Sequence, residues 1–146
     1  MLGPAGLSPI APATAGSALV AAVGWFLPVP APPVFVALLV VGTAIAVWVA
    51  GEAEKDLGHD AGPIVIDEAI GQTLALVLAP HRPLVFVAAF FLFRLFDIWK
   101  PLGAREAQAL PGGFGVVADD VIAGITSLVA LQAFLWAERH WGWTLV

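Results

Sequence analysis

Long apolar runs, interrupted by prolines and short polar segments, dominate the pattern of this sequence. No side chain is charged before Glu52, and the proline-rich stretch 28–33 separates an apolar segment at 17–27 from another at 34–50. A helix over 34–50 would be about 26 Å long, close to the hydrocarbon core of a bilayer at about 30 Å. The 34–50 segment therefore predicts a membrane-crossing helix.

Two further helices are expected where apolar segments end at prolines. One covers 66–78 and ends before Pro80, and the other covers 84–99 and ends before Pro101. The residue before a proline disfavours helical geometry, so both ends are natural stops.

A Gly-rich loop is expected at 102–118 and a last helix at 119–138. The 17–27 and 66–78 segments are too short to cross a bilayer alone. The pattern predicts an all-α fold in a single domain, a small integral-membrane helical bundle of about four to five helices, some short or only partly embedded.

Composition supports a membrane protein and excludes several functions. Hydrophobic residues make up 60% of the chain and charged residues 12%, against about 45–50% and about 25% in soluble domains. The net charge is −5 and the six basic residues are scattered, which argues against nucleic-acid binding. The absence of cysteine excludes disulfides, thiolate metal sites and a cysteine nucleophile.

Acidic residues are expected to gather at one end of the helices. If the 34–50 helix crosses the membrane, the next helix begins on the side where it emerges, and the 84–99 helix returns there. Charged groups within or near a bilayer are costly and usually mark function. The residues expected on this face are Asp67, Glu68, Asp97, Asp119 and Asp120, with Arg94 and Lys100 beside them.

Other charged residues have a simple structural explanation. Helix ends that protrude into water carry charge at little cost, which accounts for Arg82, Glu138 and Arg139. It accounts poorly for Arg94 and Asp97, which lie three residues apart on one face of an otherwise apolar helix. For these two, a structural ion pair is the alternative to a functional role.

The acidic set offers only oxygen ligands. Carboxylates suit hard cations such as Mg²⁺, whereas zinc favours His or Cys, and the three histidines are far apart. Mg²⁺ held by carboxylates typically works on a phosphate-bearing substrate. Basic side chains, hydroxyls and a Gly-rich turn can hold phosphate oxygens. The candidates are Thr14, Ser17, Arg94, Lys100, Gly112 and Gly113.

Each feature also has an ordinary explanation. The helix macrodipole favours acidic residues in a first turn, which covers the pairs at 67–68 and 119–120. Adjacent helical residues point about 100° apart, so one of each pair is expected to face the site. A Gly-Gly pair is more often a turn than a phosphate cradle. The convergence of all these residues on one face favours the functional interpretation.

Four sequence blocks resemble, in order and spacing, those of the phosphatidylglycerophosphatase A family. They are GLSPIAPATAGS (6–17), IVIDEAIGQTLAL (64–76), FRLFDIWKP (93–101) and GGFGVVADDVIAG (112–124). The resemblance covers essentially the whole chain, and the combination of FDIWKP, GGFG and DD is specific.

The resemblance implies Mg²⁺-dependent hydrolysis of phosphatidylglycerophosphate to phosphatidylglycerol and inorganic phosphate. It also implies a multi-pass protein of the bacterial inner membrane with its active site on the cytoplasmic face. Residues that match the family's polar motifs are Asp67, Glu68, Asp97, Lys100, Asp119 and Asp120, and those that match its N-terminal loop are Thr14, Gly16 and Ser17.

The sequence departs from the family pattern in three places. Ala13 replaces a glycine of the N-terminal block, the pair at 103–104 replaces Pro-Ile, and Gln108 stands where an acidic residue is common. These departures bear on headgroup contacts more than on the metal site.

The favoured mechanism is direct attack by a metal-activated water, with Asp97 as a metal ligand or general base and Lys100 on the phosphate. An aspartyl-phosphate intermediate remains open with so many carboxylates, although the DxDxT nucleophile motif is absent. The alternative function is a small membrane transporter or ion-binding subunit that uses the same acidic cluster. A transporter site is expected near the bilayer midplane, whereas these charges lie at helix ends.

Basic residues favour a cytoplasmic site under the positive-inside rule. The site side carries Lys55, Arg94, Lys100 and Arg105, against Arg82 and Arg139 on the other side. No pattern in the sequence fixes an oligomeric state.

Overall fold

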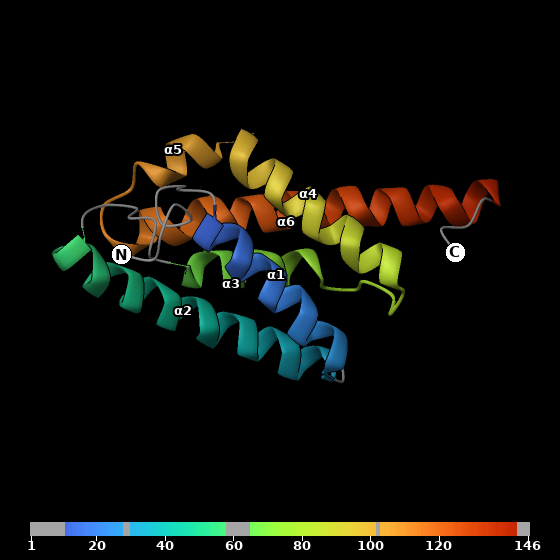
Figure 1. Cartoon of the computed structure of the whole chain (residues 1–146), viewed down its shortest axis with the longest axis horizontal. Helices are drawn as coiled ribbons and strands as arrows, with labels where there is room; N and C mark the ends of the chain where they lie inside the picture. The colour runs from blue at the N-terminus through green and yellow to red at the C-terminus, as the bar shows by residue number, and fades with distance from the viewer. Residues whose placement is uncertain (1–10, 28–29, 58–64, 102, 143–146) are drawn as a thin grey trace.

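The computed structural model describes residues 11–27, 30–57, 65–101 and 103–142. Within these residues every regular element is a helix, as Figure 1 shows, which confirms the predicted all-α class. The helices are α1 (Ala11–Phe26), α2 (Pro32–Leu57), α3 (Ile66–Ala75), α4 (Pro83–Trp99), α5 (Ala104–Gln108) and α6 (Gly113–Trp141).

Two of these helices, α2 and α6, are long and apolar enough to cross a membrane. The 34–50 segment predicted to cross lies wholly inside α2. Most of α2 faces outward, and its exposed side chains include Val36, Leu38 and Trp48. An apolar surface of this extent is expected to be covered by lipid or by another apolar surface.

The structure differs from the sequence prediction at several helix limits, and α3 ends at Ala75, three residues before its predicted end. Helix α2 continues through the polar residues to Leu57, where Glu and Lys are good helix formers and Lys55 pairs with Glu52 at 2.6 Å. Part of the expected loop forms the short helix α5. Helix α1 begins at Ala11, so Thr14, Gly16 and Ser17, which match the family's N-terminal loop, lie in a helix here.

The start of α6 is the largest difference. This helix begins at Gly113, six residues before the predicted start, so Asp119 and Asp120 lie in its second turn. A Cβ at Gly113 would lie 1.9 Å from the carbonyl oxygen of Val47 and 2.6 Å from the nitrogen of Gly51 on α2. The close α2–α6 contact holds a Gly-rich segment in a helix that its own propensity does not favour.

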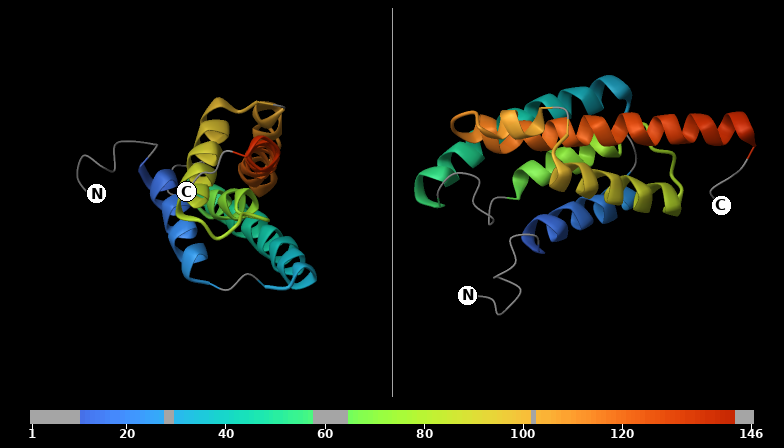
Figure 2. Two further views of the ribbon diagram at one scale, coloured as in Figure 1. Left: turned by 90° about the vertical axis from the view of Figure 1, so that its right-hand side faces the viewer. Right: turned by 90° about the horizontal axis from the view of Figure 1, so that it is seen from above.

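Helix α3 lies in the middle of the bundle and contacts α1, α2, α4 and α6. Figure 2 shows these four helices around it in two views. At Gly71 a Cβ would lie 2.4 Å from the ring of Phe93 and 2.7 Å from the carbonyl oxygen of Asp120. A Cβ at Gly124 of α6 would likewise lie 2.5 Å from the carbonyl oxygen of Gly71 on α3. Small residues therefore let α3, α4 and α6 approach closely beside the acidic residues.

Candidate active site

Helices α3 and α6 begin, and α4 ends, toward the same end of the bundle (Figure 1). A cluster of carboxylates lies there. One group joins Asp67, Glu68 and Asp120, and a second joins Asp97, Asp119 and Asp120. In each group, one oxygen from every residue lies within 4.8 Å of the others. Asp120 belongs to both groups, so the five residues predicted from the sequence form one continuous site.

Four of these carboxylates are almost fully buried. Their exposed fractions are 5% for Asp67, 7% for Glu68, 4% for Asp119 and 3% for Asp120. Asp97 is partly buried and closes the cluster from α4. Acidic side chains are almost never buried to this degree unless they are paired or hold a metal ion.

Several buried oxygens of the cluster lack a hydrogen-bond donor. Among the described residues, no partner reaches Asp67 Oδ1, Glu68 Oε2 or Asp120 Oδ2. Oxygen atoms that converge without donors fit a hard divalent cation, which needs six or so oxygen ligands from carboxylates and water. The residues present therefore fit a hard divalent cation such as Mg²⁺, and its binding here stays a prediction.

Burial also raises the pKa values of Asp67 and Glu68, the acidic pair on α3. This helix is too short to cross a bilayer. Burial, together with the hydrogen bond and negative charge of Glu68, raises the pKa of Asp67 to about 9. Burial raises the pKa of Glu68 as well, and the charge of Asp97 adds to this while Arg94 opposes it. A raised pKa means that both carboxyl groups hold their protons more tightly than ordinary acidic side chains do when no cation is bound.

Two basic residues pair with the cluster. The Arg94 guanidinium donates to Asp97 Oδ2, three residues along α4, and the Lys100 ammonium donates to Asp119 Oδ2 on α6. The ion pair considered as an alternative for Arg94 and Asp97 is therefore present, and it lies inside the carboxylate site. Two cations do not balance five carboxylates if all are ionised, so the site can accept further positive charge.

Lys100 reaches the site through an uncommon backbone conformation. It caps α4 in the left-handed region, with φ 50° and ψ 59°, and its N–H donates to the oxygen of Phe96 at 2.8 Å. A non-glycine residue in this region costs about 1 kcal/mol and is often found at functional sites. The turn ends α4 directly before Pro101 while the side chain reaches α6.

The predicted phosphate-binding residues outside α4 have structural contacts of their own. The Ser17 hydroxyl is buried and donates to the Ala13 carbonyl at 2.9 Å, within α1. Thr14 lies one turn earlier on that helix, whose Gly16 packs against Val65 just before α3.

The Gly-rich turn before α6 has two different environments. Gly112 has φ 66°, a conformation that favours glycine. The backbone of Gly113 packs closely against α2, as described above. The phosphate-binding role of these two glycines, like that of Thr14 and Ser17, stays a prediction.

One polar residue beside the cluster was not predicted. Gln72 is fully buried on α3, and neither atom of its side-chain amide has a hydrogen-bond partner among the described residues. It follows Glu68 by four residues and so shares its helix face. The four-residue spacing from Glu68 is the feature of the sequence that could have identified Gln72. A single glutamine, however, is not typical of a metal or phosphate site.

Comparison with known proteins identifies the class as a phosphatase. The chain matches the phosphatidylglycerophosphatase A family model over residues 1–135. The chain belongs to this family, and it is therefore an enzyme of the phosphatidylglycerophosphatase type. The resemblance inferred from the four sequence blocks is confirmed.

Three relatives are similar over different lengths. Phosphatidylglycerophosphatase A of Escherichia coli strain K12 is 39% identical over 140 residues, covering 93% of this chain and 79% of the relative. A Bacteroides thetaiotaomicron protein, named provisionally as a phosphatidylinositol-3-phosphatase, is 38% identical over 140 residues, covering 90% and 87%. Phosphatidylglycerophosphatase A of Haemophilus influenzae is 42% identical over 81 residues, covering 53% and 50%. No solved structure matches the chain.

Proposed function

We propose that this protein hydrolyses phosphatidylglycerophosphate to phosphatidylglycerol and inorganic phosphate, with Mg²⁺ as cofactor. The observation that carries the proposal is the pair of buried carboxylate groups that share Asp120. The name of the Escherichia coli relative supports the substrate. The two long apolar helices support a membrane location. From the sequence, we place the protein in a bacterial inner membrane with the site on the cytoplasmic face.

The residues that would hold the cation are those of the two groups. They are Asp67, Glu68, Asp97, Asp119 and Asp120. When bound, Mg²⁺ supplies positive charge that neutralises the phosphate oxygens and orients them against the attacking water.

Protein side chains supply the remaining chemistry. Arg94 and Lys100 already lie among the carboxylates, where their charge is available to the substrate phosphate. Asp97 is the least buried of the five carboxylates. We assign it the role of general base, which takes the proton from the attacking water. The water oxygen bonds to phosphorus, the bond from phosphorus to the glycerol oxygen breaks, and that oxygen leaves as the alcohol after taking up a proton. An aspartyl-phosphate intermediate is the other route open to this carboxylate set.

The position of the carboxylates supports a phosphatase over a transporter. Asp119 and Asp120 are the seventh and eighth of the 29 residues of α6. They therefore lie about 10 Å from the helix start, toward one membrane surface and away from the middle. A site at this depth can reach a lipid headgroup.

Phosphate release from purified protein tests the proposal. We expect detergent-solubilised protein to release phosphate from phosphatidylglycerophosphate with Mg²⁺ present and to stop when EDTA removes it. Asp97→Asn should abolish release, whereas the matched control Asp56→Asn, exposed near the end of α2, should retain it. No release from folded, Mg²⁺-supplied protein would refute the proposal.

A second substrate separates the activities named for the relatives. Phosphatidylinositol 3-phosphate carries the same chemical group, a phosphate monoester on a lipid headgroup. We expect slower release from this lipid than from phosphatidylglycerophosphate. The reverse order would assign the site to the inositol lipid and leave the metal site and mechanism unchanged.

A further inference from the structure

A second polar region lies at the far end of α6 from the carboxylates. There an open cleft of about 610 Å³ separates the turn after α3 from the last turns of α6. Its lining includes Leu78 and Arg82 from the turn and Gln132, Leu135 and Arg139 from α6. The lining is therefore mixed, with apolar side chains beside polar ones.

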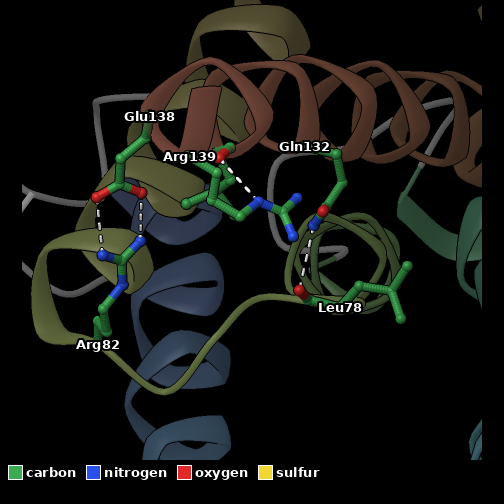
Figure 3. Close-up of polar contacts among 6 residues, drawn as sticks. Leu78, Arg82, Gln132, Glu138 and Arg139 are labelled. Carbon is green, nitrogen blue, oxygen red and sulfur yellow. Dashed lines mark hydrogen bonds and ion pairs between the residues drawn. The ribbon is translucent and has the colours of Figure 1, made fainter. Parts of the chain in front are cut away.

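One wall of the cleft is an ion pair that joins the two segments. Arg82 donates to both carboxylate oxygens of Glu138, at 2.8 and 2.6 Å, as Figure 3 shows. Glu138 is only 4% exposed. A bidentate pair of this kind is electrically neutral and geometrically fixed, so it shapes the cleft without giving it a net charge.

The opposite wall is a strained turn tied to α6. Leu78 has φ 60°, which a branched side chain adopts only under constraint. Its carbonyl accepts a hydrogen bond from Gln132 Nε2 at 3.1 Å. The Leu78 side chain remains exposed and apolar at the rim.

Arg139 supplies the net charge of the cleft. Its Nε donates to the Leu135 carbonyl at 3.2 Å, and this is the one hydrogen bond it makes among the described residues. Figure 3 shows the guanidinium extending toward Gln132 and away from the Arg82–Glu138 pair. Its terminal nitrogens therefore remain available as two charged donors.

The cleft lies one membrane thickness from the carboxylates. Arg139 follows Asp120 by 19 residues on the same helix, which is about 28 Å at helical rise and close to a hydrocarbon core of about 30 Å. Trp136 and Trp141, both exposed, flank the cleft end of α6. Tryptophan is enriched at the level of lipid headgroups.

We propose that this cleft binds the headgroup phosphate of an anionic phospholipid in the leaflet opposite the carboxylate site. Arg139 binds the phosphate through its terminal nitrogens, and the apolar rim at Leu78 and Leu135 accompanies the first part of the acyl chains. A zwitterionic headgroup has no net charge, so Arg139 attracts it less than a headgroup with a net negative charge, and the cleft selects net negative lipids. The site is separate from the one that holds substrate.

Lipid retention by the intact protein tests this site. Protein is reconstituted in nanodiscs with equal amounts of phosphatidylserine and phosphatidylcholine of matched acyl chains, and retained lipid is measured by native mass spectrometry. Phosphatidylserine is used because it is not a product of the proposed reaction. We expect wild-type protein to retain it over phosphatidylcholine by about tenfold, because phosphatidylserine has one more net negative charge near Arg139.

Three variants locate the preference. Arg139→Gln should remove it, and Arg139→Lys, which keeps the charge, should keep most of it. Arg105→Gln removes an exposed arginine of α5 at the other end of the bundle and should leave it intact. Circular dichroism checks that each variant is folded.

Several results would overturn the proposal. Equal retention of the two lipids by wild-type protein would do so, even if Arg139→Gln did not fold. So would an unchanged preference in folded Arg139→Gln, or a preference lost equally in the lysine variant. Displacement of the retained lipid by millimolar inorganic phosphate would assign the cleft to a soluble anion instead.

Discussion

The two ends of α6 treat buried charge in opposite ways. At one end, Asp119 and Asp120 lie among three more carboxylates, and buried oxygens such as Asp120 Oδ2 have no donor among the described residues. At the other end, Glu138 is just as buried, but both of its oxygens accept hydrogen bonds from Arg82. Burial alone therefore does not distinguish the candidate site carboxylates from Glu138; the missing hydrogen-bond donors do.

The comparison has an energetic basis. A buried carboxylate without partners raises the free energy of the folded state and is retained where a ligand will supply the missing charge. A buried carboxylate held by a guanidinium fork is satisfied without a ligand. Substitutions at the carboxylate end should therefore cost activity, and those at the ion-pair end should cost stability.

The largest effect is expected from Asp120→Asn, because Asp120 belongs to both carboxylate groups. Loss of even an indirect metal contact typically costs 10–100-fold, so we expect phosphatase activity to fall by at least about 100-fold. The thermal midpoint without Mg²⁺ should stay the same or rise, since one repelling charge is gone. A variant that kept its activity but melted early would place Asp120 with the structural carboxylates.

The next effect is expected from Gly71→Ala, which tests the close packing that supports the acidic end. Its Cβ would meet the ring of Phe93 and the carbonyl of Asp120, at 2.4 and 2.7 Å. We expect a loss of about 1–3 kcal/mol in unfolding free energy, with activity reduced as α3 moves away from α6. Gly42→Ala is the matched control, because its Cβ would meet only Ile70 Cδ1 at 3.4 Å. Equal stability of the two variants would contradict the close approach.

A smaller effect is expected from Glu138→Gln at the ion-pair end. Arg82 loses its charged partner but is one-third exposed, so water compensates in part. The thermal midpoint should fall by about 2–4 °C, while phosphate release per folded molecule stays at the wild-type value. Activity loss without a change in the midpoint would show that the two ends are not independent.

The last effect concerns stability alone and is expected from pH in the absence of Mg²⁺. The pKa of Asp67 is about 9 in the folded state against 3.8 for the ordinary side chain, so the unfolded chain releases this proton first as pH rises. Folded-state stability should therefore fall through that window. Asp67→Asn should show a shallower fall in thermal midpoint, and Mg²⁺ should restore the wild-type midpoint at the alkaline end. If the thermal midpoints of the two proteins fell equally with rising pH, Asp67 would not be the cause of the fall.

The sequence predicted the limits of α4 well, whereas α3 ends at Ala75, three residues before the end predicted from Pro80. The predicted 84–99 segment and α4 differ by one residue at the start, because Pro83 and Pro101 mark both limits locally. The sequence prediction was wrong at the start of α6, where the residues GGFG are typical of a loop. There the deciding contact is with Val47 and Gly51 of α2, and a contact so distant in sequence leaves no local signal.

The sequence predicted that the five carboxylates gather at one end, and it offered the Arg94–Asp97 pair as an alternative. It did not predict the Lys100–Asp119 and Arg82–Glu138 pairs. Placing helix ends on membrane sides was enough to bring five carboxylates together. The same argument treated Arg82 and Glu138 as charges protruding into water, which was wrong for Glu138. Their pairing spans 56 residues and depends on how α4 lies against α6, which periodicity does not specify.

Helix α6 also sets a length that the surrounding membrane must match. Its carboxylates and Arg139 are joined by one continuous helix and cannot change their separation, so hydrophobic mismatch would tilt the helix or distort the bilayer. We expect activity in vesicles to peak at one acyl-chain length and to decline in thinner and thicker bilayers. The enzyme would then respond to bilayer thickness as well as to the concentration of its substrate.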